Sequence, residues 1–221
     1  MKKVLLIAAI AFASVASAQK GTILLGGNIG FSSSKDSETA VPSGTRSEDK
    51  VNSFEFSPRV GYQFSDHLTV GIEGSVVSGK GESTTIPIAG FTTSTSRKIN
   101  GFAVGPFLRY SKSLSDIFAM YADLGIGFQA GKTTNETFNG LTTTSVDEKG
   151  KGIYAGITPA LFINMKKGFG VNISVGGFRY DSVNYDDQID PTTFTGTRDR
   201  KYNAFQLTFG QTVNIGISKN F

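Results

Sequence analysis

The stretch Val51-Asn-Ser-Phe-Glu-Phe-Ser-Pro-Arg-Val-Gly-Tyr-Gln-Phe64 decides the fold. Its apolar residues share one parity, namely Phe54, Phe56, Pro58, Val60, Tyr62 and Phe64, while polar or small residues hold the other. Neighbouring side chains of a β-strand point to opposite faces, so this alternation predicts a strand with one apolar and one polar face. The C-terminal segment repeats it, with Phe205, Leu207, Phe209, Val213, Ile215 and Ile217 on one parity.

Applied to the whole chain, the same pattern predicts eight strands, near residues 21–31, 52–64, 68–78, 100–111, 117–131, 152–164, 169–180 and 202–221. Long connections (32–51, 79–99, 132–151 and 181–201) alternate with short ones (65–67, 112–116 and 165–168). Short turns between consecutive strands indicate an antiparallel meander. The long connections are rich in Ser, Thr, Gly and charged residues, and we expect them to be mobile loops at one end.

Three prolines, Pro58, Pro106 and Pro159, fall inside the predicted strands and precede short turns. Proline removes a hydrogen-bond donor from the sheet and is confined to edges and bulges. We therefore expect a local bulge at each of the three.

The N-terminus has the features of a secretory signal: Lys2 and Lys3, the apolar run Val4 to Ala13, and Ala16-Ser17-Ala18. This order of charged, apolar and small residues is typical of a cleaved leader. We predict a signal peptide over 1–18 and one mature domain over 19–221. The apolar run is too short for a membrane helix, which needs ~20 apolar residues.

Composition excludes several classes of function. The chain has no Cys, which excludes disulfides, zinc–thiolate sites and thiol nucleophiles. The formal net charge is only +4, and two of those charges, Lys2 and Lys3, lie in the expected leader. The remaining basic residues are spread along the chain, so we expect no nucleic-acid partner, because such proteins cluster Lys and Arg on one face.

The polar face of the strands distinguishes a membrane barrel from a soluble barrel or sandwich. Its residues are mostly Gly, Ser, Thr, Asn, Gln and Ala, which suit a confined interior better than a water-exposed surface. All five mid-strand charges share this inward parity: Glu55, Arg59, Glu73, Arg109 and Asp123. An eight-stranded barrel is just wide enough for side chains to fill it, so these charges must pair. We predict a charge network in a closed lumen, with Arg59 opposite Glu73.

Aromatic residues on the apolar parity gather toward both strand ends. Phe31, Phe54, Phe102, Phe128 and Phe205 lie toward the long connections, and Tyr62, Phe64, Tyr110, Phe118, Phe169 and Phe221 lie toward the short turns. Two such girdles are typical of barrels that cross a bilayer. Phe107 and Phe162 have the inward parity, and we interpret them as filling the lumen. With an even number of strands, we expect both termini and the short turns in the periplasm and the long loops outside the cell.

The last eight residues, Asn214-Ile215-Gly216-Ile217-Ser218-Lys219-Asn220-Phe221, resemble the C-terminal assembly signal of bacterial outer-membrane barrels, chiefly through Gly216 and Phe221. Lys219 departs from that signal, which prefers an apolar residue there. More broadly, Gln19 to Phe221 is similar to the small outer-membrane β-barrel family of the opacity-protein and outer-membrane-protein-X type, and the Pro-containing hairpins resemble its Bacteroidota branch. The resemblance implies an all-β, eight-stranded up-and-down barrel in the outer membrane of a Gram-negative bacterium. It also implies contact with outer-membrane lipid, lipopolysaccharide and the barrel-assembly machinery, and a monomeric state.

Members of that family serve as structural proteins, adhesins or surface-interaction proteins, and a few modify lipids. The enzymes place a His near the outer rim, whereas the only histidine here, His67, falls in a predicted short turn. We therefore expect no catalytic residue and no cofactor. Asp186, Asp187 and Asp190 match no calcium loop, and we expect no metal. We predict a non-enzymatic integral outer-membrane protein with a structural, adhesion or surface-interaction role through its four long extracellular loops, which could contact an extracellular ligand. The alternatives are a small porin or gated channel, and a soluble lipocalin-like ligand-binding barrel.

Overall fold

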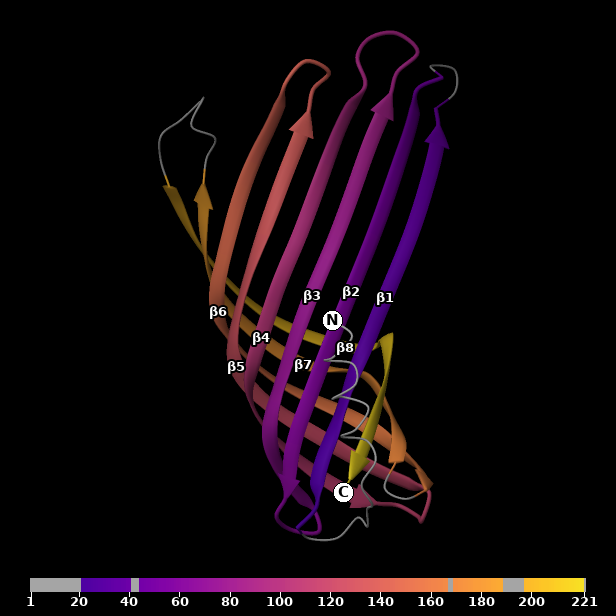
Figure 1. The fold of residues 1–221 in the computed structure, drawn as a ribbon, viewed down its shortest axis with the longest axis vertical. Coiled ribbons are helices and arrows are strands. Elements are labelled where there is room, and N and C mark those ends of the chain that lie inside the picture. Colours follow the sequence, from indigo (N-terminus) through magenta and orange to yellow (C-terminus); the bar gives the residue numbers. More distant parts are fainter. Residues whose placement is uncertain (1–20, 41–43, 167–168, 189–196, 221) are drawn as a thin grey trace, which may run out of the picture.

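The chain folds into eight antiparallel strands in sequence order (Figure 1). The structure is a computed structural model, and it describes residues 21–40, 44–166, 169–188 and 197–220. The strands are β1 (Ile23–Thr39), β2 (Arg46–Gln63), β3 (Leu68–Ile86), β4 (Thr93–Ser113), β5 (Phe118–Phe138), β6 (Thr143–Lys166), β7 (Phe169–Gln188) and β8 (Thr197–Asn220). The predicted signal peptide, residues 1–18, lies outside the described residues. The described residues contain no helix that is long and apolar enough to cross a membrane.

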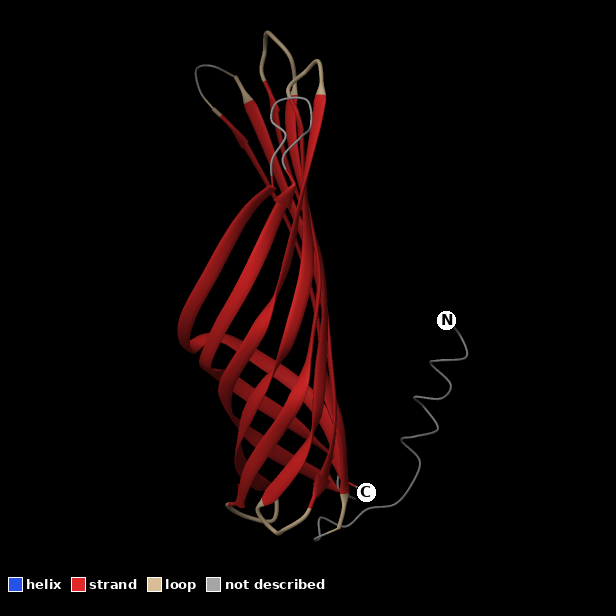
Figure 2. Cartoon of the chain, turned by 90° about the vertical axis from the view of Figure 1, so that its left-hand side faces the viewer, coloured by secondary structure: helices blue, strands red, loops and turns tan. Residues whose placement is uncertain are grey.

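Each strand pairs with its neighbours along the chain, and β8 pairs with β1 to close the barrel (Figure 2). The prediction of an eight-stranded antiparallel barrel is therefore confirmed. The closing pair is short. All 17 residues of β1 pair with β2, but within the described residues only Leu24–Asn28 pair with β8, against Gly216–Asn220. We call these five residue pairs the β1·β8 junction.

The strands extend well beyond the predicted bounds, but at one end only. Most of the segments 32–51, 79–99, 132–151 and 181–201 is strand, so the expectation that they are loops is wrong. Figure 1 shows the resulting hairpins rising from the closed part of the barrel. We call this the long-hairpin end; the opposite, short-turn end joins β2 to β3, β4 to β5 and β6 to β7.

The long hairpins form because their polar residues suit paired strands even without apolar alternation. Thr has a high β-propensity, and threonines face each other at Thr85–Thr93 and Thr137–Thr144. Ser32 and Ser53 hydroxyls lie 2.8 Å apart across β1 and β2. Such cross-strand pairs each contribute roughly 0.2–1 kcal/mol, which adds up over a hairpin.

The three prolines behave differently from one another. The pairing of β6 with β7 shifts register by one residue between Ile157 and Ala160, so a bulge lies beside Pro159 as expected, but the extra residue is in β7 and not in β6. At Pro58 and Pro106 the expectation is wrong: pairing with one neighbour is interrupted there and resumes in the same register. The missing N–H therefore costs ladder hydrogen bonds at these two positions without inserting a residue.

The two faces of the sheet have the polarity of a membrane barrel. Large apolar side chains point outward, including Phe56, Leu207 and Ile215, which are 45%, 54% and 63% exposed. The interior instead buries Arg109 and Asp123, each 6% exposed, together with Phe107 and Tyr121. A soluble lipocalin-like barrel would have the reverse arrangement, so that alternative is wrong for this chain.

Outward aromatic side chains lie near both ends of the closed region. Phe31, Phe128 and Phe205 are exposed toward the long hairpins, and Tyr62 and Tyr110 toward the short turns. Phe221 lies outside the described residues. Phe107 is 2% exposed, and Phe162 lines an internal cavity, so both inward aromatics lie in the lumen as predicted.

Candidate functional site: the barrel lumen

The centre of the lumen is occupied by a buried ion pair between neighbouring strands. Arg109 of β4 and Asp123 of β5 lie directly opposite each other. Arg109 Nε donates to Asp123 Oδ1 at 2.7 Å, and its Nη2 donates to Oδ2 at 2.8 Å. Paired hydrogen bonds of this kind are the strongest that a guanidinium makes with a carboxylate, and they fix the relative orientation of both groups.

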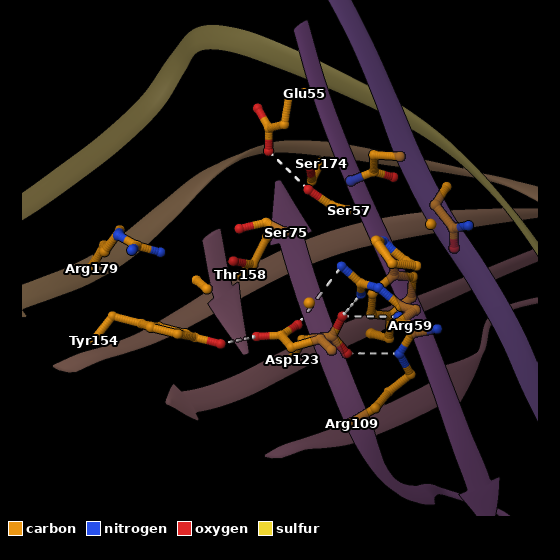
Figure 3. Close-up of a pocket in the computed structure, with 18 residues that line it drawn as sticks. Glu55, Ser57, Arg59, Ser75, Arg109, Asp123, Tyr154, Thr158, Ser174 and Arg179 are labelled. Carbon is orange, nitrogen blue, oxygen red and sulfur yellow. Dashed lines mark hydrogen bonds and ion pairs between the residues drawn. The ribbon is translucent and has the colours of Figure 1, made fainter. Parts of the chain in front are cut away.

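Two further charges, from β2 and β3, join this pair (Figure 3). Arg59 Nη1 donates to Asp123 Oδ2, so Asp123 binds two guanidinium groups. Glu73 lies opposite Arg59, with its Oε2 3.9 Å from Arg59 Nη2. The hydroxyl of Tyr154 on β6 donates to Glu73 Oε1 at 3.3 Å. We call Arg59, Glu73, Arg109 and Asp123 the ion-pair cluster; its formal charges sum to zero.

The structure does not bring the fifth predicted residue, Glu55, into this cluster. Its Oε1 accepts a hydrogen bond of 2.9 Å from the Ser57 hydroxyl, and in the described part of the chain it makes no salt bridge. Figure 3 shows Glu55 and Ser57 apart from Arg109 and Asp123. Four of the five predicted charged residues therefore form the ion-pair cluster, and Glu55 lies outside it.

Aromatic rings complete the closed layer. The Arg109 guanidinium lies 3.6 Å from the centre of the Tyr121 ring, and that of Arg59 lies 5.8 Å from the centre of the Phe107 ring. Such cation–π contacts are worth ~2 kcal/mol when water is excluded. Sequence analysis missed Tyr121 and Tyr154, although both have the inward parity of their strands.

A second polar group, also missed, lies nearer the long-hairpin end. Arg179 of β7 binds Asp181, with Nε 2.9 Å from Oδ2, and its Nη2 donates to Gln129 Oε1 at 3.2 Å. Gln129 in turn donates to Asp181 Oδ1 at 2.7 Å. The Arg179 guanidinium also lies 4.8 Å from the centre of the Tyr154 ring, which connects this group to the ion-pair cluster.

Two adjoining cavities open beyond the ion-pair cluster on the long-hairpin side. One, of about 290 Å³, is bounded by the cluster, and the other, of about 360 Å³, reaches the bases of the hairpins. Glu55, Ser75, Ala103 and Arg179 line both cavities. We call the two cavities together the cup.

A smaller cavity of about 160 Å³ lies on the short-turn side of the closed layer. Arg109 and Tyr121 line both this cavity and the cup. The lumen is therefore closed by a layer only about one side chain thick. His67 lies in the β2–β3 turn, with Nδ1 3.1 Å from the carbonyl oxygen of Ser111, and it lines neither cavity.

The long hairpins are held by charged pairs. Lys132 Nζ lies 2.7 Å from Asp147 Oδ2, and Arg200 Nη2 lies 2.9 Å from Glu148 Oε1. The hydrogen bonds that Asp147 accepts from Lys132 and from the Thr134 hydroxyl lower the pKa of its carboxyl. These contacts order the hairpins beyond the closed region.

The predicted assembly residue Gly216 lies within the β1·β8 junction. It is buried, and it pairs with Asn28 of β1 and with Asn172 of β7. A Cβ at this position would lie 1.8 Å from Asn28 Oδ1 and 2.9 Å from the Gly27 carbonyl oxygen, so any larger residue would require Asn28 to move. Phe221, the other predicted assembly residue, lies outside the described residues.

No group of three or more His, Cys, Asp or Glu side chains in the described part of the chain could hold a metal ion. The side chains of Asp187 and Asp190, which the sequence analysis considered with Asp186, lie outside what the structure describes.

An apolar exterior around a polar, charge-filled lumen defines the class of integral outer-membrane β-barrels. Residues 4–212 match the outer membrane protein beta-barrel domain family, and the chain belongs to that family. Among solved structures it is similar to the outer membrane protein OprG from Pseudomonas aeruginosa, at 14% identity and a TM-score of 0.48, covering 94% of this chain and 99% of that one. It is also similar to Ail, the attachment invasion locus protein of Yersinia pestis, at 15% identity and a TM-score of 0.40, covering 92% and 100%. A comparison with curated proteins finds no match.

Proposed function

We propose that this protein is a non-enzymatic component of the outer-membrane surface that binds external ligands through its long hairpins. The observation that carries the proposal is the closed lumen: Arg109, Asp123 and Tyr121 are all buried at its centre. With the lumen closed, the long hairpins, which extend beyond the closed part of the barrel, are the surface we propose for contact. Their paired strands and charged pairs hold that surface in a defined shape.

The proposal includes an orientation. The short turns and both termini would face the periplasm and the long hairpins the outside, as expected for barrels with an even number of strands. The outward apolar residues would contact lipid, and the bases of the hairpins would contact lipopolysaccharide. The protein would be a monomer inserted by the barrel-assembly machinery, with Gly216 and Phe221 in its recognition signal.

Limited proteolysis of intact cells with proteinase K tests the orientation. We expect cuts confined to the connections 40–45, 87–92, 139–142 and 189–196, and a folded band whose gel mobility changes on heating. A first cut in the β2–β3 turn around His67 would contradict the proposed orientation.

A small channel is the second candidate, and the thinness of the closed layer favours it. Because Arg109 and Tyr121 line both the cup and the short-turn cavity, movement of a few side chains would connect the two. Planar-bilayer recording distinguishes the two candidates. The surface-binding proposal expects no single-channel steps from the purified protein; regular steps that change in Arg59→Ala would instead support a gated channel.

A further inference from the structure

In the described part of the chain, each charged side chain that lines the cup forms a salt bridge with an oppositely charged side chain, except for Glu55. The ion-pair cluster is neutral by itself, and Arg179 pairs with Asp181. Lys132 and Glu148, which line the hairpin side, pair with Asp147 and Arg200. Glu55 lines both cavities and, in the described residues, has only the Ser57 hydroxyl as a partner. Among the described side chains, the cup therefore carries one uncompensated negative charge.

A second residue with an unsatisfied acceptor lines the same cavity. Asn172 is 8% exposed and lines the inner part of the cup. Its amide nitrogen donates to the Ser218 hydroxyl at 2.9 Å, but among the described side chains its Oδ1 has no hydrogen-bond partner. A buried amide oxygen left without a hydrogen bond is unfavourable, so it favours a donor that can reach it.

The hairpin side of the cup adds an apolar wall. Val77, Ile99 and Val183 line the cavity of about 360 Å³, and Val77 lies directly opposite Glu55 on the neighbouring strand. Small-molecule sites in proteins combine such apolar surface with a few polar groups in cavities of ~300–1,000 Å³. An anion in the cup would be repelled by Glu55, and the guanidinium groups that could bind it already bind carboxylates. A cation could instead form a salt bridge with Glu55.

We propose that the cup binds small primary alkylammonium compounds, with the ammonium group on Glu55 and the alkyl chain on Val77, Ile99 and Val183. The ammonium group supplies three N–H donors, which suits a cavity whose unmatched groups are acceptors. This goes beyond the proposed surface function and does not depend on it, because the cup is built whichever way the barrel is oriented and whatever the hairpins contact.

Methyl-resolved NMR tests this binding site directly. The protein is placed in nanodiscs of zwitterionic phosphatidylcholine, and butylammonium chloride is titrated while the methyl resonances of Val77, Ile99 and Val183 are followed. We expect saturable shifts of these resonances. Butyrate and butanol share the alkyl chain but not the positive charge. We expect them to bind at least about tenfold more weakly in the same titration, because an ionic hydrogen bond is lost. This comparison uses the unmodified protein, so it holds even where a variant fails to fold.

Two variants assign the effect to Glu55. Glu55→Gln should weaken butylammonium binding at least about tenfold, since it removes the negative charge. Glu82→Gln is the matched control: it makes the same change in the β3–β4 hairpin, where Glu82 pairs with Lys80 and does not line the cup, and it should leave binding unchanged.

Several results would overturn the proposal. Absent methyl shifts would show that no alkylammonium site exists. Equal shifts with butanol would indicate an apolar cavity without charge selection, and equal losses in both Gln variants would indicate general electrostatic attraction. Potassium chloride that displaces butylammonium at equal concentration would show a simple cation site in which the apolar wall has no part.

Discussion

Arg109 and Asp123 face each other across β4 and β5 and share two hydrogen bonds of 2.7 and 2.8 Å while both are 6% exposed. We predict that Asp123→Asn lowers the free energy of unfolding by about 3–5 kcal/mol, because it leaves the buried guanidinium group of Arg109 without a carboxylate and leaves Arg59 with Glu73 alone. Urea unfolding in lipid vesicles measures the change. Glu136→Gln, which breaks the exposed pair with Lys98, should cost under about 1 kcal/mol; equal losses in the two variants would argue against a buried pair.

The neutrality of the ion-pair cluster leads to a second prediction. Removal of Arg59 alone leaves the ion-pair cluster net negative, and removal of Glu73 alone leaves it net positive, but removal of both leaves the neutral Arg109–Asp123 pair. We expect Arg59→Met and Glu73→Gln each to destabilise the barrel more than the double variant does. A double-mutant cycle with additive losses would contradict this coupling.

The close packing at Gly216 makes a third prediction. Gly216→Ala should slow folding and reduce the heat-modifiable fraction, because the added methyl group would overlap Asn28 Oδ1. Gly81→Ala is the control, since a Cβ there meets nothing within 4 Å. Asn28→Ala combined with Gly216→Ala should recover part of the loss. Equal folding of the two single variants would show that the contact is unimportant.

The β5–β6 hairpin should respond to acid through Asp147. Its carboxyl has a lowered pKa, so the stabilisation it provides is fully present above its ordinary pKa near 3.8 and is lost as the pH falls through the lower value of the folded protein. Carbonyl NMR titration of Asp147 should give a midpoint below 3.8. Lys132→Met should raise this midpoint, and Lys151→Met, at a neighbouring exposed lysine, should not; an unchanged midpoint in both would exclude the hydrogen bond from Lys132.

Alternation in the sequence predicted the face of each strand residue but not its height in the barrel. Glu55 and Arg59 share a face, yet four residues separate them by about 13 Å along the strand. A prediction based on parity alone therefore placed Glu55 in the ion-pair cluster, although its side chain makes no contact with those four residues among the interactions described above. The contact of Arg59 with Asp123, three strands apart in sequence order, depends on barrel curvature, which no local pattern encodes.

The hairpins could not be predicted for a different reason. Beyond Phe31 and Phe54 the strands have polar residues on both faces, so the period-two signal disappears although the backbone pairing continues. Sequence analysis missed the interior tyrosines because parity gives the direction of a side chain but not its contacts. The contacts of Tyr154 with Arg179 and Glu73 are defined only by the folded barrel.

The β1·β8 junction also bears on how a barrel of this kind could grow. An extra β-hairpin added between β8 and β1 would interrupt five residue pairs, whereas one added between β1 and β2 would interrupt pairing along all 17 residues of β1. A duplication that adds two strands at either chain end would therefore break the fewest strand pairs. It would yield a ten-stranded barrel with a wider lumen.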